Sequence, residues 1–269
     1  PVAFFVIYHF GWRLGFVALA LLGVAWVVFF LPWFRNDPAE HKSVNAAELE
    51  LLQSSRKLVL HEHGVPWYRL LLQRDIALLG LQYFAFSYTW YFYVTWLPTW
   101  LQQARGLAPG IAAGYAMVPL AAGGVGSIVS GFLPMSIPRK WVAFAGFSGT
   151  AILVFIIPHV EGVTTAMILM GLASFCSDLT MPISWNTCVE IGKQYTATVA
   201  STMNMLGNFA GFVAPVVFGY ILGETDNNWT IVMYTMAAAA VVSAACWLFL
   251  DPDKHGRVQD LPLEGAPEI

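Results

Sequence analysis

Long apolar runs separated by short polar segments dominate the 269-residue chain. A helix that crosses a hydrocarbon layer about 30 Å thick needs about 20 mainly apolar residues, because it rises about 1.5 Å per residue. Residues 1–9 are too short to span and are typical of the end of a helix; a turn at 10–13 then leads into a first full span over 14–34. Further apolar runs predict six more helices, over 76–102, 108–135, 141–158, 163–189, 195–222 and 229–250.

A polar segment over 35–67 separates the first span from the other six. Within it, Asn45 followed by Glu48 favours the start of a short amphipathic helix that reaches about Ser55. Because the first helix has no beginning, we expect a fragment of a longer protein. The pattern predicts four parts: the end of one helical bundle over 1–34, a linker over 35–67, a six-helix transmembrane bundle over 68–250 and a polar tail over 251–269.

Composition indicates a membrane protein and excludes several other classes. The chain is 58% hydrophobic and 11% charged, whereas soluble domains are about 25% charged. A net charge of −3, without a basic patch interleaved with aromatic residues, excludes a nucleic-acid-binding domain. The three cysteines lie in apolar runs without CxxC spacing, and His61 and His63 lack further ligands nearby, so no metal site is predicted.

The distribution of basic residues predicts the orientation. Eleven of the thirteen Lys and Arg residues fall on the side of the 35–67 linker, and only Arg13 and Arg105 fall on the other. Basic loops stay in the cytoplasm, so we expect the linker and the C-terminus there, in a multi-pass protein of the cell (inner) membrane. One odd helix, a cytoplasmic linker and six helices with both ends inside are typical of part of a twelve-helix transporter.

Five stretches carry a resemblance to a known family: FGWRLGF at 10–16, RNDPAEHKSVNAAELELLQ at 35–53, LGLQYFAFSYTWYFYVTWLPTWLQQARGL at 79–107, MPISW at 181–185 and NMLGNFAGFVAPVVFGYI at 204–221. In these the chain resembles the major facilitator superfamily, and within it the anion:cation symporter family, whose members carry organic anions such as sugar acids. One segment departs from the family pattern, because the loop at 131–140 is shortened and lacks the Asp expected in a Gly-rich loop that helps gate the cytoplasmic side.

The resemblance implies the fold and the activity. The expected fold is all-α and transmembrane: a complete C-terminal six-helix bundle plus the last one and a half helices of an N-terminal bundle that is otherwise missing from this chain. The expected activity is secondary transport of a small organic anion by proton-coupled alternating access. The proton and membrane lipid are then partners, no cofactor is needed, and no catalytic residue is expected.

Polar residues within the apolar runs are the candidate site residues, because an unsatisfied amide or carboxylate in hydrocarbon costs several kcal/mol. The resemblance implies that Gln82, Ser184, Trp185 and Asn204 contact the substrate. An amide offers a donor and an acceptor to hydroxyls and carboxylates, and an indole can pack on a carbon skeleton. Tyr91 is placed deep enough for its phenol to bind a polyol. Each of these residues has a structural alternative, an interhelical hydrogen bond or packing alone.

Four more residues are expected to line the cavity or pack around it. Thr89 lies seven residues after Gln82 and so shares its helix face. Asn208 follows Asn204 by one turn on the next polar stripe. Gly207 and Gly211 form a GxxxG step, which is typical of close approach by another backbone.

Asp178 is the one carboxylate near the middle of a predicted span. Burial disfavours an ionised carboxylate, so Asp178 is a possible proton carrier, with a structural, hydrogen-bonded acid as the alternative. Its spacing from Trp185 predicts a shared face, with Pro182 as a kink between them. Trp96 and Trp100 are expected in the outer aromatic belt.

Two other classes of membrane protein also have about seven spans. A photoreceptor would need a lysine for a retinal Schiff base, and residues 229–250 contain none. A membrane-embedded enzyme would need clustered His, Asp or Ser side chains, whereas Asp178 stands alone near midplane. The sequence therefore favours a transporter over a receptor or an enzyme.

Overall fold

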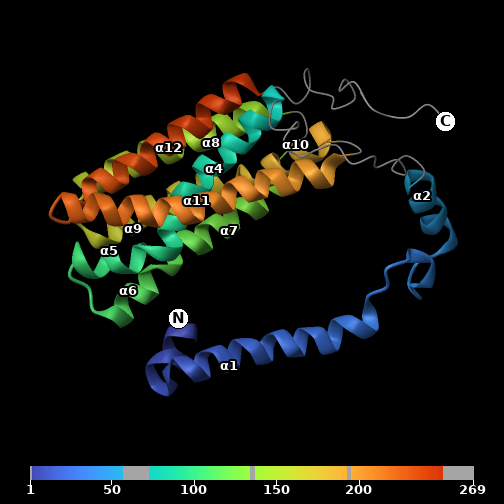
Figure 1. Cartoon of the computed structure of the whole chain (residues 1–269), viewed down its shortest axis with the longest axis horizontal. Coiled ribbons are helices and arrows are strands. Elements are labelled where there is room, and N and C mark those ends of the chain that lie inside the picture. Colours follow the sequence, from blue (N-terminus) through green and yellow to red (C-terminus); the bar gives the residue numbers. More distant parts are fainter. Residues whose placement is uncertain (1, 57–72, 134–136, 193–194, 251–269) are drawn as a thin grey trace. The chain divides into compact units, whose positions relative to one another are not determined.

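The computed structural model describes residues 2–56, 73–133, 137–192 and 195–250, and within these ranges the chain is helical with no strand (Figure 1). The chain divides into two compact units, Pro1–His63 and Gly64–Ile269. The end of the predicted linker, the middle of the 131–140 loop and the predicted tail over 251–269 lie outside the described residues.

The described residues of the first unit form α1 (Val2–Trp33), the short 3-10 helix η1 (Pro38–Glu40) and α2 (Ala46–Arg56). α1 is kinked at Gly11, whose φ of 82° and ψ of 161° glycine adopts without strain. The turn predicted at 10–13 is therefore confirmed. At the start of α2, the side chain of Asn45 accepts a hydrogen bond of 2.9 Å from the backbone N–H of Glu48, so the predicted helix start is also confirmed.

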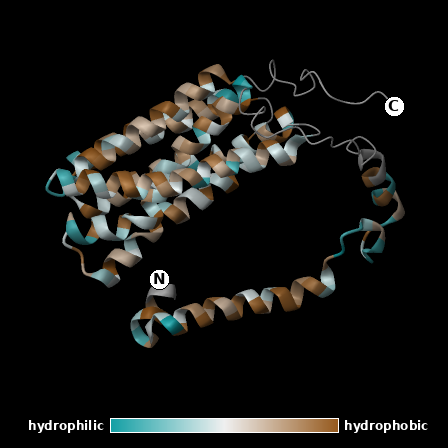
Figure 2. Cartoon of the chain, in the orientation of Figure 1, coloured by the Kyte–Doolittle hydropathy of each residue, from teal (hydrophilic) through white to brown (hydrophobic). Residues whose placement is uncertain are grey.

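α1 is mainly apolar (Figure 2), although its N-terminal part carries His9 and Arg13. The most apolar 18-residue window of the segment Phe5–Trp33 has a mean hydropathy of 2.7, and only 6% of that window is buried. A helix that is apolar on every side is stable only against lipid or against other protein. α1 is therefore a membrane-spanning helix by its surface as well as by its length.

The second unit contains the helices that correspond to the six later apolar runs: α4 (Arg74–Thr95), α5 (Leu97–Gln103), α6 (Pro109–Tyr115), α7 (Met117–Gly131), α8 (Arg139–Ile156), η2 (Ile157–His159), α9 (Val163–Asp178), α10 (Met181–Gly192), α11 (Thr196–Glu224) and α12 (Trp229–Phe249). The run at 76–102 becomes α4 and α5, the run at 108–135 becomes α6 and α7, and the run at 163–189 becomes α9 and α10.

Each of these three breaks lies two or three residues before a proline, and the one at Ala116 precedes Pro119. α4 ends next to Trp96, two residues before Pro98, and α9 and α10 are separated by Leu179 and Thr180, just before Pro182. Proline lacks a backbone N–H, and its ring clashes with the carbonyl of the preceding turn. The kink predicted at Pro182 is thus confirmed, and it takes the form of a complete break in the helix.

α4 is the central helix of the second unit. It packs against α11 on one side and α12 on another, while α12 also packs against α8 (Figure 1). α7 and α8 both pack against α9, and α10 packs against α11. The helices of the unit thus form a connected series from α7 through α9, α8, α12, α4 and α11 to α10.

Six segments of the described residues are long and apolar enough to cross a membrane: Phe5–Trp33, Pro109–Gly131, Arg139–His159, Val163–Gly192, Thr196–Glu224 and Trp229–Phe249. The predicted run at 76–102 is not among them, because its middle carries Gln82 and a series of tyrosine and threonine side chains. α4 can hold these groups because it is hidden from lipid, with Leu79, Gln82 and Phe92 all 0% exposed. The protein is an integral, multi-pass, all-α membrane protein, as predicted.

The close crossing of α7 and α9 can be tested at one glycine. A Cβ atom at Gly126 would overlap the carbonyl oxygen of Phe175, whereas a Cβ atom at Gly124 would meet nothing within 4 Å. We expect Gly126→Ala to unfold in detergent with a free energy about 1–3 kcal/mol lower than Gly124→Ala, because the helices must separate to make room. Both variants gain the same helix propensity, so equal unfolding free energies would contradict the packing described.

Candidate functional site

A cavity of about 300 Å³ opens between α4, the start of α10 and the middle of α11. Aromatic rings, hydroxyls and amides face it, although the surrounding helices are largely apolar. Its lining residues are Tyr83, Phe86, Ser87, Trp90 and Tyr91 from α4, Met181 from α10, and Asn204, Gly207 and Asn208 from α11.

Two glycines of α11 allow the side chains of α4 that line the cavity to approach α11 closely. A Cβ atom at Gly207 would lie 2.6 Å from the ring of Tyr83, and one at Gly211 would overlap the ring of Tyr91. The space over each glycine is occupied by a tyrosine ring of α4, and α4 packs closely along this face of α11. Gly207 lines the cavity, and Gly211 supports Tyr91 from behind.

Two polar side chains and one backbone carbonyl form a connected series at the cavity wall. The hydroxyl of Tyr91 donates to Oδ1 of Asn208 at 3.2 Å, and Nδ2 of Asn208 donates to the backbone carbonyl of Asn204 at 2.8 Å. Asn204 and Asn208 are exposed, and the side-chain amide of Asn204 makes no hydrogen bond to another described residue. Asn204 therefore has donor and acceptor groups available to a molecule in the cavity.

Gln82 and Ser184 meet away from the cavity. Nε2 of Gln82 donates to Oγ of Ser184 at 3.1 Å, and both residues are fully buried, at 0% and 1% exposure. Oγ of Ser184 in turn donates to the carbonyl of Thr180. Oε1 of Gln82 is buried and has no hydrogen-bond partner among the described residues. In this conformation the pair joins α4 to α10 and leaves one amide oxygen unsatisfied.

Tyr83 and Trp185, the residues that follow Gln82 and Ser184 in the sequence, are also in contact. Tyr83 and Trp185 make an edge-to-face contact with ring centroids 6.1 Å apart. Trp185 is half-buried and packs on a ring that lines the cavity, without lining it. The two dipeptides Gln82-Tyr83 and Ser184-Trp185 thus contact each other. The amide of the first bonds the hydroxyl of the second, and its phenol ring packs on the indole.

Thr89 and Asp178 are both buried outside the cavity. The hydroxyl of Thr89 donates to the carbonyl of Met236 at 3.3 Å, which ties α4 to α12. Oδ2 of Asp178 accepts from the hydroxyl of Ser174 at 3.0 Å, and its carboxylate fills the space above Gly123 of α7.

The predicted shared face of Asp178 and Trp185 is wrong. Asp178 ends α9 and contacts α7, whereas Trp185 belongs to α10 and contacts Tyr83 of α4. Helical spacing places residues on one face only within a continuous helix, and the break at Leu179 and Thr180 turns the two residues toward different neighbours.

Sequence reasoning missed several residues of the cavity wall as site residues, namely Tyr83, Phe86, Ser87, Trp90 and Met181. A signal for the α4 members was present, because Tyr83, Ser87 and Trp90 or Tyr91 recur at three- and four-residue steps and so share one helix face. No spacing rule could have added Met181, which comes from another helix.

A family model described as the Major Facilitator Superfamily matches residues 1–215 of the chain. The chain belongs to the major facilitator superfamily. Members of this family are transporters, so the receptor and enzyme alternatives are excluded. This superfamily member is not an enzyme.

Three relatives define its neighbourhood in the superfamily. It is 29% identical over 265 residues to a probable sulfoacetate transporter of Cupriavidus necator, a match that covers 94% of this chain and 60% of that protein. It is 25% identical over 253 residues to a probable L-galactonate transporter of Escherichia coli, covering 89% and 55%. It is 23% identical over 265 residues to the hexuronate transporter of Bacillus subtilis, covering 94% and 61%.

All three names refer to transport of a small organic anion, so the resemblance to the sugar-acid and organic-anion branch is confirmed. The chain spans 55% to 61% of the length of these relatives.

The hydrogen bond between Gln82 and Ser184 can be measured by a double-mutant cycle. We expect Gln82→Leu and Ser184→Ala to couple by about 0.6 kcal/mol in the free energy of unfolding, the average for such bonds between membrane helices. Gln82→Leu with Thr187→Ala is the control, because the Thr187 hydroxyl bonds only within its own helix, to the carbonyl of Ile183. Coupling no larger than in the control would mean that Gln82 is not engaged with Ser184.

Proposed function

We propose that this chain is the C-terminal part of a secondary transporter that moves a small organic anion, a sugar acid or related carboxylate, by proton-coupled alternating access. The supporting observation is the cavity between α4, α10 and α11, where phenol, hydroxyl and amide groups gather inside a membrane bundle. Polar groups at that depth are costly unless they serve binding or helix packing. The names of the relatives point to the same class of substrate.

Asn204 and Tyr91 make the first contacts with the substrate in this proposal. The amide of Asn204 binds a hydroxyl or carboxylate directly, and the phenol of Tyr91 presents its oxygen while Asn208 fixes its position. The rings of Tyr83 and Trp90 pack on the carbon skeleton. The cavity wall carries no cation, so in this proposal the charge of the carboxylate is met by basic residues of an N-terminal bundle.

Gln82, Ser184 and Trp185 join the site only when the bundle changes conformation. Separation of the rings of Tyr83 and Trp185 uncovers the amide and hydroxyl behind them, and the unsatisfied Oε1 of Gln82 then gains a donor from a substrate hydroxyl. A ligand can shift a conformational equilibrium only by binding one state better than the other. The new hydrogen bonds to Gln82 and Ser184 form only in the closed, occluded state. They therefore make the substrate bind that state more tightly than the open one.

The coupling proton is carried by acids of the N-terminal bundle, and Asp178 is a structural acid. Its carboxylate is occupied by Ser174 and by the wall of α7, and it does not line the cavity. The linker over 35–67 and the C-terminus face the cytoplasm in the cell (inner) membrane, in accordance with the excess of Lys and Arg on that side.

Uptake of labelled glucarate into liposomes that contain the complete transporter tests the proposed function. We expect accumulation when the interior is alkaline and none without a pH gradient. Asn204→Ala should raise the KM for uptake about tenfold or more, because it removes hydrogen bonds to a charged substrate worth about 1.5–3 kcal/mol.

Met205→Ala is the matched control, because Met205 is the next residue, is 47% exposed and does not line the cavity. Its KM should stay at the wild-type value. Accumulation that does not depend on the pH gradient would contradict proton coupling. An equal KM in the two variants would show that Asn204 does not contact the substrate.

A further inference from the structure

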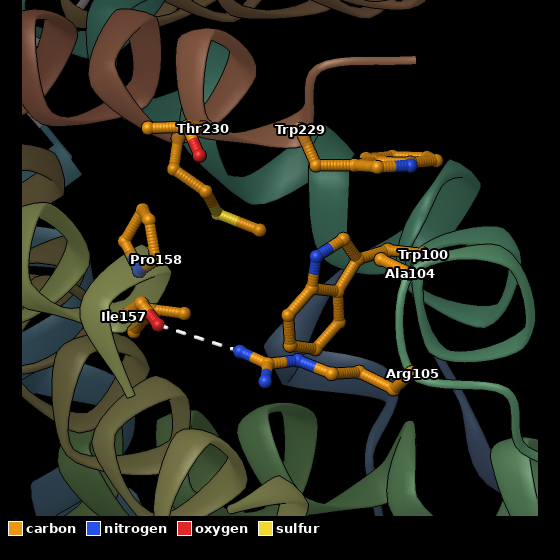
Figure 3. Close-up of a pocket in the computed structure, with 8 residues that line it drawn as sticks. Trp100, Ala104, Arg105, Ile157, Pro158, Trp229 and Thr230 are labelled. Atoms are coloured by element: carbon orange, nitrogen blue, oxygen red, sulfur yellow. Dashed lines mark hydrogen bonds between the residues drawn. The ribbon is translucent and has the colours of Figure 1, made fainter. Parts of the chain in front are cut away.

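A second cavity, of about 220 Å³, lies at the end of the bundle where α5 turns toward α6 and α12 begins. We call it the Arg105 pocket. It is separate from the central cavity and shares no lining residue with it. Figure 3 shows its walls, with Trp100 and Trp229 facing Ile157 and Pro158. The lining residues are Trp100, Ala104, Arg105, Ile157, Pro158, Trp229, Thr230 and Met233.

The Arg105 pocket enters the core of the bundle. Trp100, Ile157, Trp229 and Met233 are 3%, 0%, 8% and 1% exposed, and all four belong to one continuous hydrophobic cluster. The expectation that Trp100 belongs to a lipid-facing aromatic belt is therefore wrong. The break at Trp96 starts a new helix, and α5 turns Trp100 inward. The walls of the pocket are therefore continuous with the core of the bundle.

Local backbone structure directs Arg105 into this pocket. Gly106 adopts a φ of 67°, a left-handed conformation that favours glycine, and backbone bonds from Gly106 to Gln102 and from Leu107 to Leu101 close the turn after α5. The guanidinium lies over the indole of Trp100, 5.0 Å from its centroid. It reaches beneath that ring toward the carbonyl of Ile157 (Figure 3).

The positive charge of Arg105 has no negative partner in the described part of the chain. Its guanidinium donates to two neutral groups, the carbonyls of Glu161 at 2.9 Å and of Ile157 at 3.5 Å. The one ion pair among the described residues joins Arg139 and Glu190 instead. A guanidinium has five N–H donors, so these two bonds leave donors free for a ligand. An uncompensated cation beside an apolar pocket favours an anion there.

We propose that the Arg105 pocket is a second substrate-class site, which binds the carboxylate of a small organic acid. The guanidinium fork matches the two oxygens of a carboxylate, the indoles of Trp100 and Trp229 cover the carbon skeleton, and the hydroxyl of Thr230 is available to a substrate hydroxyl. The pocket is smaller than the roughly 300–1,000 Å³ typical of drug-sized ligands, which suits a small acid.

The role of this site in transport rests on the proposed function, whereas binding to it does not. Arg105 lies on the side predicted to face away from the cytoplasm, so the pocket would hold the anion at the outer end of the bundle before it reaches the central cavity. A mere clamp between the turn after α5 and η2 would need hydrogen-bond donors but no charge. Charge dependence is therefore the property to test.

Protection of a cysteine in the pocket from a thiol reagent gives a readout specific to this site. Thr230→Cys is made in the full chain, reconstituted in nanodiscs of zwitterionic lipid, and its labelling rate is measured with increasing glucarate or with uncharged sorbitol. We expect glucarate to slow labelling and sorbitol to have no effect. In Arg105→Gln the protection should vanish, and in Arg105→Lys, which keeps a charge but not the fork, half-protection should need about tenfold more glucarate.

Lys140→Gln is the matched control, because Lys140 also lies over an indole, 5.8 Å from the centroid of Trp141, but lines neither cavity. It should leave protection unchanged. Equal labelling rates of the Arg105 variants without glucarate show that the pocket is intact. Asn204→Ala should also leave protection unchanged. Loss of uptake through the central cavity and loss of binding to the Arg105 pocket are therefore detected by different measurements.

Three results would overturn the proposal: no protection by glucarate in the otherwise wild-type chain, equal protection in Arg105→Gln, or equal protection by sorbitol. The same labelling in nanodiscs that contain phosphatidylglycerol tests whether a lipid headgroup occupies the pocket. If that lipid alone protects Thr230→Cys and glucarate adds nothing in either lipid, the pocket binds lipid phosphate and the proposal fails.

Discussion

The close packing of α4 against α11 is the contact on which the rest of the second unit depends. Gly207 and Gly211 remove two side chains from the facing surface of α11, and the rings of Tyr83 and Tyr91 occupy that space. These contacts place the phenols and hydroxyls of α4 beside the amides of α11. In a membrane, where lipid tails are as apolar as leucine, such side-chain packing holds helices together in place of a hydrophobic driving force. The same contact builds the bundle and the wall of its cavity.

Polar groups in this bundle are divided between helix packing and the cavity. Gln82 bonds Ser184, and Thr89 bonds the carbonyl of Met236, so these groups hold α4 to α10 and to α12. Asn204 and Tyr91 remain at the cavity. In this arrangement the side-chain oxygen of Gln82 is buried without a hydrogen-bond partner among the described residues.

Breaks in the helices decide where charged and aromatic groups point. The interruption between α9 and α10 sends Asp178 toward α7 and Trp185 toward α4, and the one at Trp96 turns Trp100 into the core. Each break frees backbone groups that membrane helices tolerate when neighbouring helices and hydroxyl side chains satisfy them. Thr180 serves this purpose at the first break, where its hydroxyl donates to the carbonyl of Ser177. Both cavities lie next to such a break.

The sequence by itself determined the membrane class, the helix positions and the superfamily, because apolar runs of spanning length and short motifs are local properties of the chain. It also placed Tyr91, Asn204 and Asn208 on helices that meet at a cavity. Only the tertiary structure decided which polar groups face that cavity. Helical spacing predicts a shared face only within an unbroken helix, and it does not predict which other helix packs against that face. Burial of Gln82 against Ser184, and the pocket around Arg105, depend on contacts between residues 52 to 102 positions apart. Spacing along one helix carries no information about such contacts.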